Sequence, residues 1–147
     1  EGKNKNQLMK ILEAVDIIYV QSENAFYLLK QMRKSGFNKI IKKLLQKGIV
    51  YIGVSAGSVV AGKTVETASW GSNPDKKVVN LISLKGLKLI KSNIFVHYKP
   101  EDEAMIKQKS ERVKKKLRIL TDEQALFVVG KKIILVGEGK AIDPLTL

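Results

Sequence analysis

The fold is decided by the stretch Tyr51-Ile52-Gly53-Val54-Ser55-Ala56-Gly57-Ser58. The apolar run that leads into it predicts a buried strand, and the small residues after Ser55 predict the start of a helix. Gly-x-Ser-x-Gly at such a junction is the sequence form of a nucleophile elbow, in which a sharp turn lifts a serine hydroxyl clear of the sheet. Tight turns of glycine and serine also occur in other α/β proteins, so the pattern alone leaves a purely structural turn open.

Composition excludes several kinds of site. The chain has 147 residues, no cysteine and one histidine, which predicts a single domain, 1–147, with a sizeable core and without disulfide or thiol chemistry. A metal site is not expected, because too few zinc ligands are present. No apolar run is long enough to cross a membrane, and the first residues form no apolar signal core. We therefore expect a cytoplasmic protein with no membrane partner.

The formal net charge of +13 raises the question of nucleic-acid binding. The lysines are spread along the chain, mostly on the polar faces of predicted helices. The densest cluster, Lys114-Lys115-Lys116-Leu117-Arg118, has no interleaved aromatic residues. A lysine-rich, solvated surface explains this pattern, so no nucleic-acid partner is expected.

Strands alternate with helices along the chain, which favours a parallel, doubly wound sheet. Strands are predicted at 17–20, 49–54, 64–68 and 93–96, and a hairpin at 126–129 and 132–136. Helices are predicted at 8–15, 26–32, 37–45 and just after Ser55, and a long amphipathic helix from Pro100 to Leu117.

His97 is the candidate base for Ser55. A serine hydroxyl is a poor nucleophile until a base takes its proton, and His97 is the only histidine of the chain. It follows a predicted strand directly, and so does Ser55. Ligands of open α/β sheets bind at the carboxyl ends of the strands, so both side chains are expected at one edge.

These segments occur in an order that resembles one known family. The order is Asp16–Val20, Asn24–Leu29, Tyr51–Gly62, His97-Tyr98 and Thr121–Ala125. It resembles the peptidase E family (peptidase family S51), the aspartyl dipeptidase and cyanophycinase group of serine peptidases, from Asp16 to about Val136. The resemblance implies a three-layer α/β/α sandwich with a mostly parallel sheet, similar to class I glutamine amidotransferases and flavodoxin-like in type. It also implies hydrolysis of short peptides, among them dipeptides with N-terminal Asp, without a cofactor.

By the same resemblance, Ser55 is the nucleophile and His97 the general base. The family's acid lies between serine and histidine, and Asp75, 22 residues before His97, fits that place best. Glu66 is the alternative acid. Aspartyl dipeptidases hold the substrate carboxylate with a basic residue after the histidine, and Arg112 lies in about that region.

The oxyanion hole is the part where this chain departs from the family. The resemblance implies backbone N–H donors at Ala56 and in a glycine-rich turn after the Asp16–Val20 strand. Here that turn is Gln21-Ser22-Glu23, so the donors would be Ser22 or Glu23. A residue other than glycine can donate an N–H only if it tolerates the backbone angles that the turn requires. The proline that usually precedes the histidine is Val96 here.

The chain begins after roughly two β-α units that the family carries before Asp16. Without these units a sheet edge and an apolar face would be exposed, which favours association, for example into a homodimer. Two functions follow as expectations: a serine peptidase, and an impaired relative that acts as a binding or structural module.

Overall fold

The protein is described by a computed structural model over residues 5–113 and 117–144, of which residues 110–113 are described in their backbone only. The elements are α1 (Lys5–Leu12), β1 (Ile17–Ser22), α2 (Ala25–Lys34), α3 (Phe37–Gln46), β2 (Val50–Ser55), α4 (Ala56–Ala61), the 3₁₀ helix η1 (Glu66–Ser69), β3 (Asn93–Phe95), the 3₁₀ helix η2 (Pro100–Asp102), α5 (Glu103–Val113), β4 (Leu117–Ile119), β5 (Gln124–Val129) and β6 (Lys132–Gly137). Within the described ranges, no helix has the length and apolar character that crossing a membrane requires.

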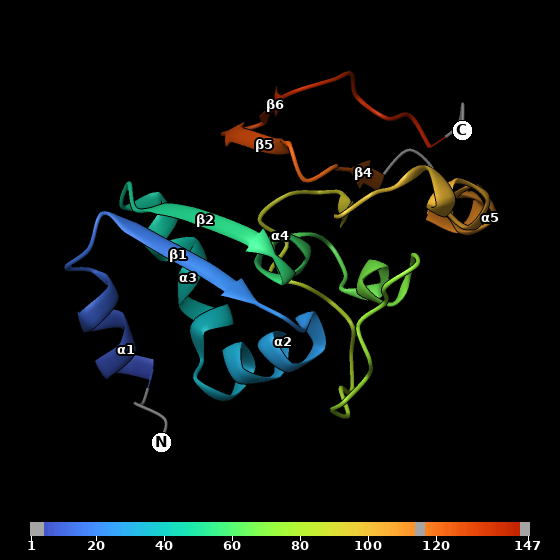
Figure 1. Cartoon of the computed structure of the whole chain (residues 1–147). Coiled ribbons are helices and arrows are strands. Elements are labelled where there is room, and N and C mark those ends of the chain that lie inside the picture. Colours follow the sequence, from blue (N-terminus) through green and yellow to red (C-terminus); the bar gives the residue numbers. More distant parts are fainter. Residues whose placement is uncertain (1–4, 114–116, 145–147) are drawn as a thin grey trace.

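The first half of the chain is a parallel β1–β2 pair with helices on one face. The register runs from Ile17 opposite Val50 to Ser22 opposite Ser55. Figure 1 shows α2 and α3 on the same side of this pair, and both strands point toward the end where α4 begins. The side chain of Asn24 accepts the Tyr27 N–H at 2.9 Å and caps α2. The end of β2 and the beginning of α2 therefore lie at one edge.

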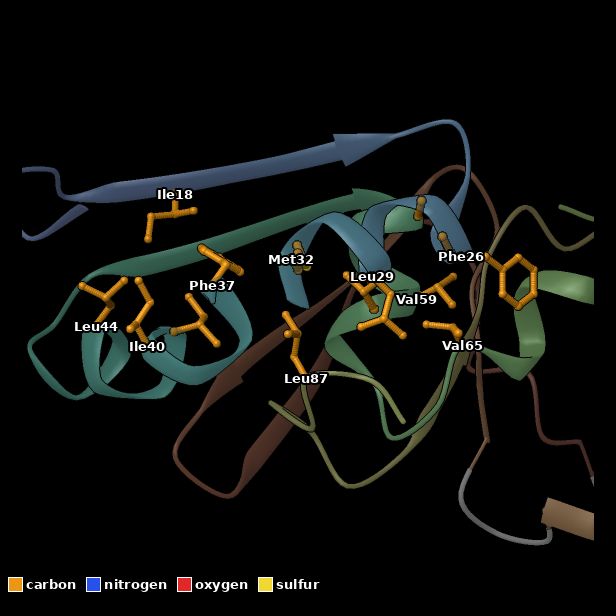
Figure 2. Packing of buried hydrophobic residues seen from close by; sticks show 14 of the residues in the cluster. Ile18, Phe26, Leu29, Met32, Phe37, Ile40, Leu44, Val59, Val65 and Leu87 are labelled. Atoms are coloured by element: carbon orange, nitrogen blue, oxygen red, sulfur yellow. The ribbon is translucent and has the colours of Figure 1, made fainter. Parts of the chain in front are cut away.

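The main core fills the space between this pair and its helices (Figure 2). Ile18 points from β1 toward Ile40 and Leu44 of α3, and Leu29 of α2 lies close to Val59 of α4. All five side chains are buried. This burial fixes the strand ends relative to α4, because apolar side chains that are removed from water hold the elements together.

The opposite face of the β1–β2 pair is apolar and exposed. Ile17 pairs with Val50 and Tyr19 with Ile52, and all four side chains are exposed. They form one contiguous patch, because residues two apart on a strand share a face. Association into a homodimer stays a prediction.

The second half of the chain contains a parallel β3–β4 pair and the antiparallel β5–β6 hairpin. The hairpin turns at Gly130, whose φ of 57° suits the tight connection. Leu126, Ile133 and Leu135 of this hairpin pack against the cluster that contains Ile94 of β3 and Leu120. The α/β class with parallel strand pairs is as predicted.

Two element predictions are wrong. Residues 64–68 do not form a strand, because Ala68 N–H bonds Val65 C=O and the segment closes into η1. The predicted helix from Pro100 does not reach Leu117, which lies in β4 and pairs with Asn93. In β4 the buried Leu117 and Ile119 flank the exposed Arg118, which is the period of a strand.

Candidate functional site

Ser55 lies on a strained turn between β2 and α4. Its φ is 51° and its ψ −118°, an uncommon backbone conformation for a residue with a side chain. A Cβ on Gly53 would lie 2.6 Å from the Gly57 carbonyl oxygen, and one on Gly57 would lie 2.0 Å from the Val20 carbonyl oxygen. Only glycine therefore fits on either side of Ser55, as the nucleophile elbow requires.

Two hydrogen bonds hold the elbow. The Tyr51 hydroxyl donates to the Gly57 carbonyl at 2.7 Å, and the Ser58 hydroxyl donates to the Gly53 carbonyl at 2.6 Å. Burial raises the pKa of the Tyr51 phenol above its usual value, so it remains a donor. Both bonds connect β2 to α4 across the turn and fix the direction of the Ser55 side chain.

Gly57→Ala is expected to destabilise the fold, because its methyl group would force β1 and α4 apart. Overpacking of this kind typically costs about 1–3 kcal/mol of unfolding free energy. The measurement is the urea midpoint. Gly62→Ala is the matched control, since its Cβ would meet a carbonyl oxygen at 3.0 Å instead of 2.0 Å. A urea midpoint for Gly57→Ala at or above that of Gly62→Ala would contradict the close contact between Gly57 of α4 and the Val20 carbonyl of β1.

His97 reaches Ser55 from the end of β3. Its Nε2 lies 2.8 Å from Ser55 Oγ, so the structure brings the two side chains together. His97 has a φ of 60°. On either side of it, Leu120 N–H bonds the Phe95 carbonyl and Tyr98 N–H bonds the Leu120 carbonyl. These two backbone hydrogen bonds to Leu120, just after β4, hold the His97 imidazole next to the elbow.

The carboxylate on the imidazole belongs to Asp122. Its Oδ1 lies 2.5 Å from His97 Nδ1. Asp122 follows β4 as His97 follows β3, and these strands are parallel neighbours, so both side chains emerge at the same edge. With Nδ1–H donated to Asp122, Nε2 is left to accept the Ser55 hydroxyl proton.

The expectation that Asp75 or Glu66 holds the imidazole is therefore not met. Asp75 lies at the same pocket, but its Oδ2 accepts the Ala25 N–H at 2.6 Å. Glu66 begins η1 and is exposed. The separation of 22 residues that favours Asp75 is a distance along the chain, and it does not determine the distance between the two side chains in space. One sequence feature could have identified Asp122. It is an acidic residue just after a strand, β4, that pairs with the strand before His97.

The predicted oxyanion donors also lie near the elbow. Ala56 is the first residue of α4 and is buried, and Ser22 is the β1 residue paired with Ser55. The strand continues through Ser22 instead of ending at Val20, and the Ser22 hydroxyl accepts the Asn24 N–H at 3.3 Å. Glu23 follows with an exposed side chain.

Ser55, His97 and Asp122 open on a pocket of about 310 Å³. Its remaining lining comes from Ala56, Val59, Thr67, Ala68, Trp70, Gly71, Ser72, Asn73, Asp75, Phe95, Val96, Lys99 and Asp102. The apolar wall includes Trp70 and Phe95, with ring centroids 6.4 Å apart. Lys99 is the cationic side chain among the described lining residues. The pocket thus combines an apolar wall with charges of both signs, a lining typical of a small-molecule site.

Asp102 is a structural residue of the pocket that the sequence did not reveal. It is buried, and its two oxygens accept the backbone N–H groups of Ser72 at 2.8 Å and Lys99 at 3.0 Å. Gly71, with a φ of 83°, lies against this carboxylate and Phe95. Asp102 thus connects the 70–75 loop to the segment after His97.

Two further predictions concern ligands of the site. Arg112 lies in α5, but its side chain is outside the described part of the structure. Among the side chains that are described, no three of His, Asp and Glu gather as metal ligands would.

The sequence is similar to those of several peptidases. An uncharacterized peptidase of Listeria monocytogenes is 30% identical over 122 residues, which cover 81% of this chain and 59% of the relative. A Drosophila melanogaster protein named "Probable alpha-aspartyl dipeptidase" is 30% identical over 142 residues, which cover 88% of this chain and 57% of the relative. Peptidase E of Streptomyces coelicolor is 28% identical over 119 residues, which cover 81% of this chain and 46% of the relative. The chain thus spans about half to three fifths of the length of these relatives.

A solved structure and a family model agree with these similarities. A crystal structure of a Listeria monocytogenes protein, provisionally assigned to peptidase E, superposes with a TM-score of 0.75 and 26% identity. The match covers 93% of this chain and 67% of that protein. The sequence model of peptidase family S51 matches residues 1–136. With the elbow at Ser55 and the order of strands around it, this match shows that the chain belongs to peptidase family S51.

Proposed function

We propose that this chain carries the site of a serine peptidase that hydrolyses short peptides. The observation that carries the proposal is the continuous hydrogen-bonded series from Ser55 through His97 to Asp122, which opens on one pocket. A hydroxyl, an imidazole and a carboxylate in this order are the parts of a serine triad.

The chemistry would proceed in two steps. Ser55 Oγ attacks the scissile carbonyl carbon while His97 Nε2 takes the hydroxyl proton, and Asp122 stabilises the imidazolium that forms. The proton then passes to the departing amine as the C–N bond breaks, which leaves an ester on Ser55. Water, deprotonated by His97, attacks this ester, and the proton returns from His97 to Ser55 Oγ as the C–O bond breaks and the acid is released. The N–H groups of Ala56 and of Ser22 or Glu23 would bind the oxyanion.

The site is open to solvent, which bears on substrate size. The side chains of His97 and Asp122 are 55% and 65% exposed. Solvent screening weakens this ion pair relative to a buried one, so the rate enhancement should be smaller than in an enclosed triad. A pocket of about 310 Å³ is at the small end for ligand sites, which supports a dipeptide over a folded protein as the substrate.

For the substrate we propose dipeptides with an acidic N-terminal residue. The name of the Drosophila relative supports this choice, and Lys99 in the pocket offers a positive charge to a substrate carboxylate. Arg112, the other cation considered for that role, stays a prediction. For the complete fold we propose the three-layer α/β/α sandwich of class I glutamine amidotransferase-like proteins, which the parallel strand pairs and the TM-score support.

The test combines labelling with a peptide panel. A fluorophosphonate should modify Ser55, located by peptide mass mapping, and Asp-Leu should be hydrolysed faster than Ala-Leu. Folded protein that neither reacts with the probe nor cleaves any dipeptide would instead support the impaired binding module. Turnover of simple esters without turnover of peptides would point to an acyl hydrolase of another kind.

A further inference from the structure

The carboxylates that line the pocket differ in how many of their oxygens have partners. Both oxygens of Asp102 accept backbone N–H groups, and Asp122 contacts His97. Asp75 uses Oδ2 for the Ala25 N–H. Among the described residues its Oδ1 has no hydrogen-bond partner, and Asp75 lines the same pocket as Ser55. One carboxylate oxygen in the pocket that Ser55 lines is thus available to a ligand.

Asp75 is held firmly in this place. Its own N–H donates to the Ala68 carbonyl at 2.7 Å, and the neighbouring Lys76 carbonyl accepts the Asn24 side-chain amide at 2.9 Å. With the bond to Ala25, three contacts fix the carboxylate against the start of α2. A preorganised acceptor loses little entropy when a ligand binds, so it can discriminate between ligands.

The electrostatic setting of Asp75 favours a cationic partner. Partial burial raises the pKa of its carboxyl above the usual value, and the Ala25 N–H and the charge of His97 oppose that shift. A partly desolvated carboxylate gains more from a cation than one in water does. Lys99, the lining cation, is a long side chain with an exposed position, and no ion pair joins it to Asp75.

The pocket that Asp75 lines is the place where one charged group of the substrate would lie. In a peptide that is cut after its first residue, the α-ammonium lies two bonds from the scissile carbonyl carbon. When that carbon is at Ser55 Oγ, the ammonium must lie in the same small pocket. We propose that Asp75 binds the α-ammonium of the substrate and thereby restricts cleavage to peptides with an unblocked N-terminus. This inference rests on the peptidase function proposed above.

Asp75→Asn tests the assignment with a matched pair of ligands. The amide oxygen of asparagine can still accept the Ala25 N–H, so the local structure is kept while the charge is lost. The ligands are Asp-Leu and succinyl-leucine, which differ only in the ammonium group. We expect Asp75→Asn to lower kcat/KM for Asp-Leu by about 10- to 100-fold, the usual range for a hydrogen bond to a charged group, and to leave succinyl-leucine unchanged. Glu101→Gln removes a charge from a nearby exposed residue outside the pocket and should change neither value.

Equal losses on both ligands would show that Asp75 does not recognise the substrate ammonium, and an unchanged preference for Asp-Leu would also overturn the proposal. A binding measurement separates this inference from the peptidase function. In the Ser55→Ala background, calorimetry should give tighter binding of Asp-Leu than of succinyl-leucine, and adding Asp75→Asn should abolish the difference. Failure of hydrolysis with this binding pattern intact would count against the peptidase function and not against Asp75.

Discussion

Ser55→Ala is expected to abolish hydrolysis, with kcat falling by about 10⁶-fold, the loss seen when a triad serine is removed. The variant lacks the oxygen that would form the ester intermediate. The hydroxyl of Ser58, on the same turn, is donated to the Gly53 carbonyl and so is not positioned to replace it. The measurements are kcat/KM for Asp-Leu and mass detection of fluorophosphonate labelling, which should both vanish.

The fold should tolerate this change. The Ser55 hydroxyl contacts His97 at the half-exposed mouth of the pocket, and alanine keeps the Cβ, so the backbone strain at φ 51° is unchanged. The urea midpoint should therefore stay close to that of the unmodified chain.

Ser58→Ala is the matched control, because it removes a hydroxyl from the same turn. We expect it to lower stability by about 1 kcal/mol through the lost bond to Gly53 and to retain labelling at Ser55. Persistent hydrolysis in Ser55→Ala, within tenfold of the unmodified chain, would mean that the elbow is structural and that the reaction takes place elsewhere.

The elbow and His97 could be predicted because each is a local pattern. An apolar run followed by Gly-x-Ser-x-Gly fixes a strand, a turn and a helix within about a dozen residues. His97 needed only one further step, that it follows a strand. Strand ends of a parallel sheet meet at one edge, so the proximity of the two side chains followed without knowledge of the strand order.

Asp122 could not be predicted in this way, because its position depends on a strand pairing. β4 has only three residues, Leu117–Ile119, and its first residue also fits the apolar stripe of the preceding helix. When Leu117 is assigned to that helix, the sequence predicts no strand beside β3. Nothing then indicates that Asp122 lies at the same sheet edge as His97. Chain separation then favours Asp75, whose carboxylate accepts the Ala25 N–H instead.

The strand misassigned at 64–68 has a similar cause. Val65 and Thr67 are both buried, which is the alternation expected of a strand. The Thr67 hydroxyl, however, donates to the Ile94 carbonyl at 2.5 Å. This segment therefore contacts β3 through a side-chain hydrogen bond and not through the backbone hydrogen bonds of a paired strand. Periodicity reports which side chains are buried, and the choice between a strand and a 3₁₀ turn depends on the neighbouring backbone.

Asp122→Asn is expected to lower kcat by about 10²- to 10⁴-fold, with the upper limit set by the loss seen when a buried triad aspartate is replaced in this way. The amide can donate to His97 Nδ1, which would leave the proton on Nε2, where it blocks the transfer from Ser55. We expect less than the full loss because the side chains of His97 and Asp122 are 55% and 65% exposed, so water already weakens their interaction.

Comparing Asp122→Asn with Asp75→Asn on two ligands distinguishes the roles of the two acids. Asp122 acts on the base, so its replacement should reduce turnover of Asp-Leu and succinyl-leucine by the same factor, with KM nearly unchanged. Asp75 acts on the substrate ammonium, so its replacement should affect Asp-Leu alone. If Asp75→Asn instead impaired both ligands more strongly than Asp122→Asn, Asp75 would be the acid that supports His97 during turnover. The contact of 2.5 Å between His97 and Asp122 would then describe a resting arrangement that changes when substrate binds.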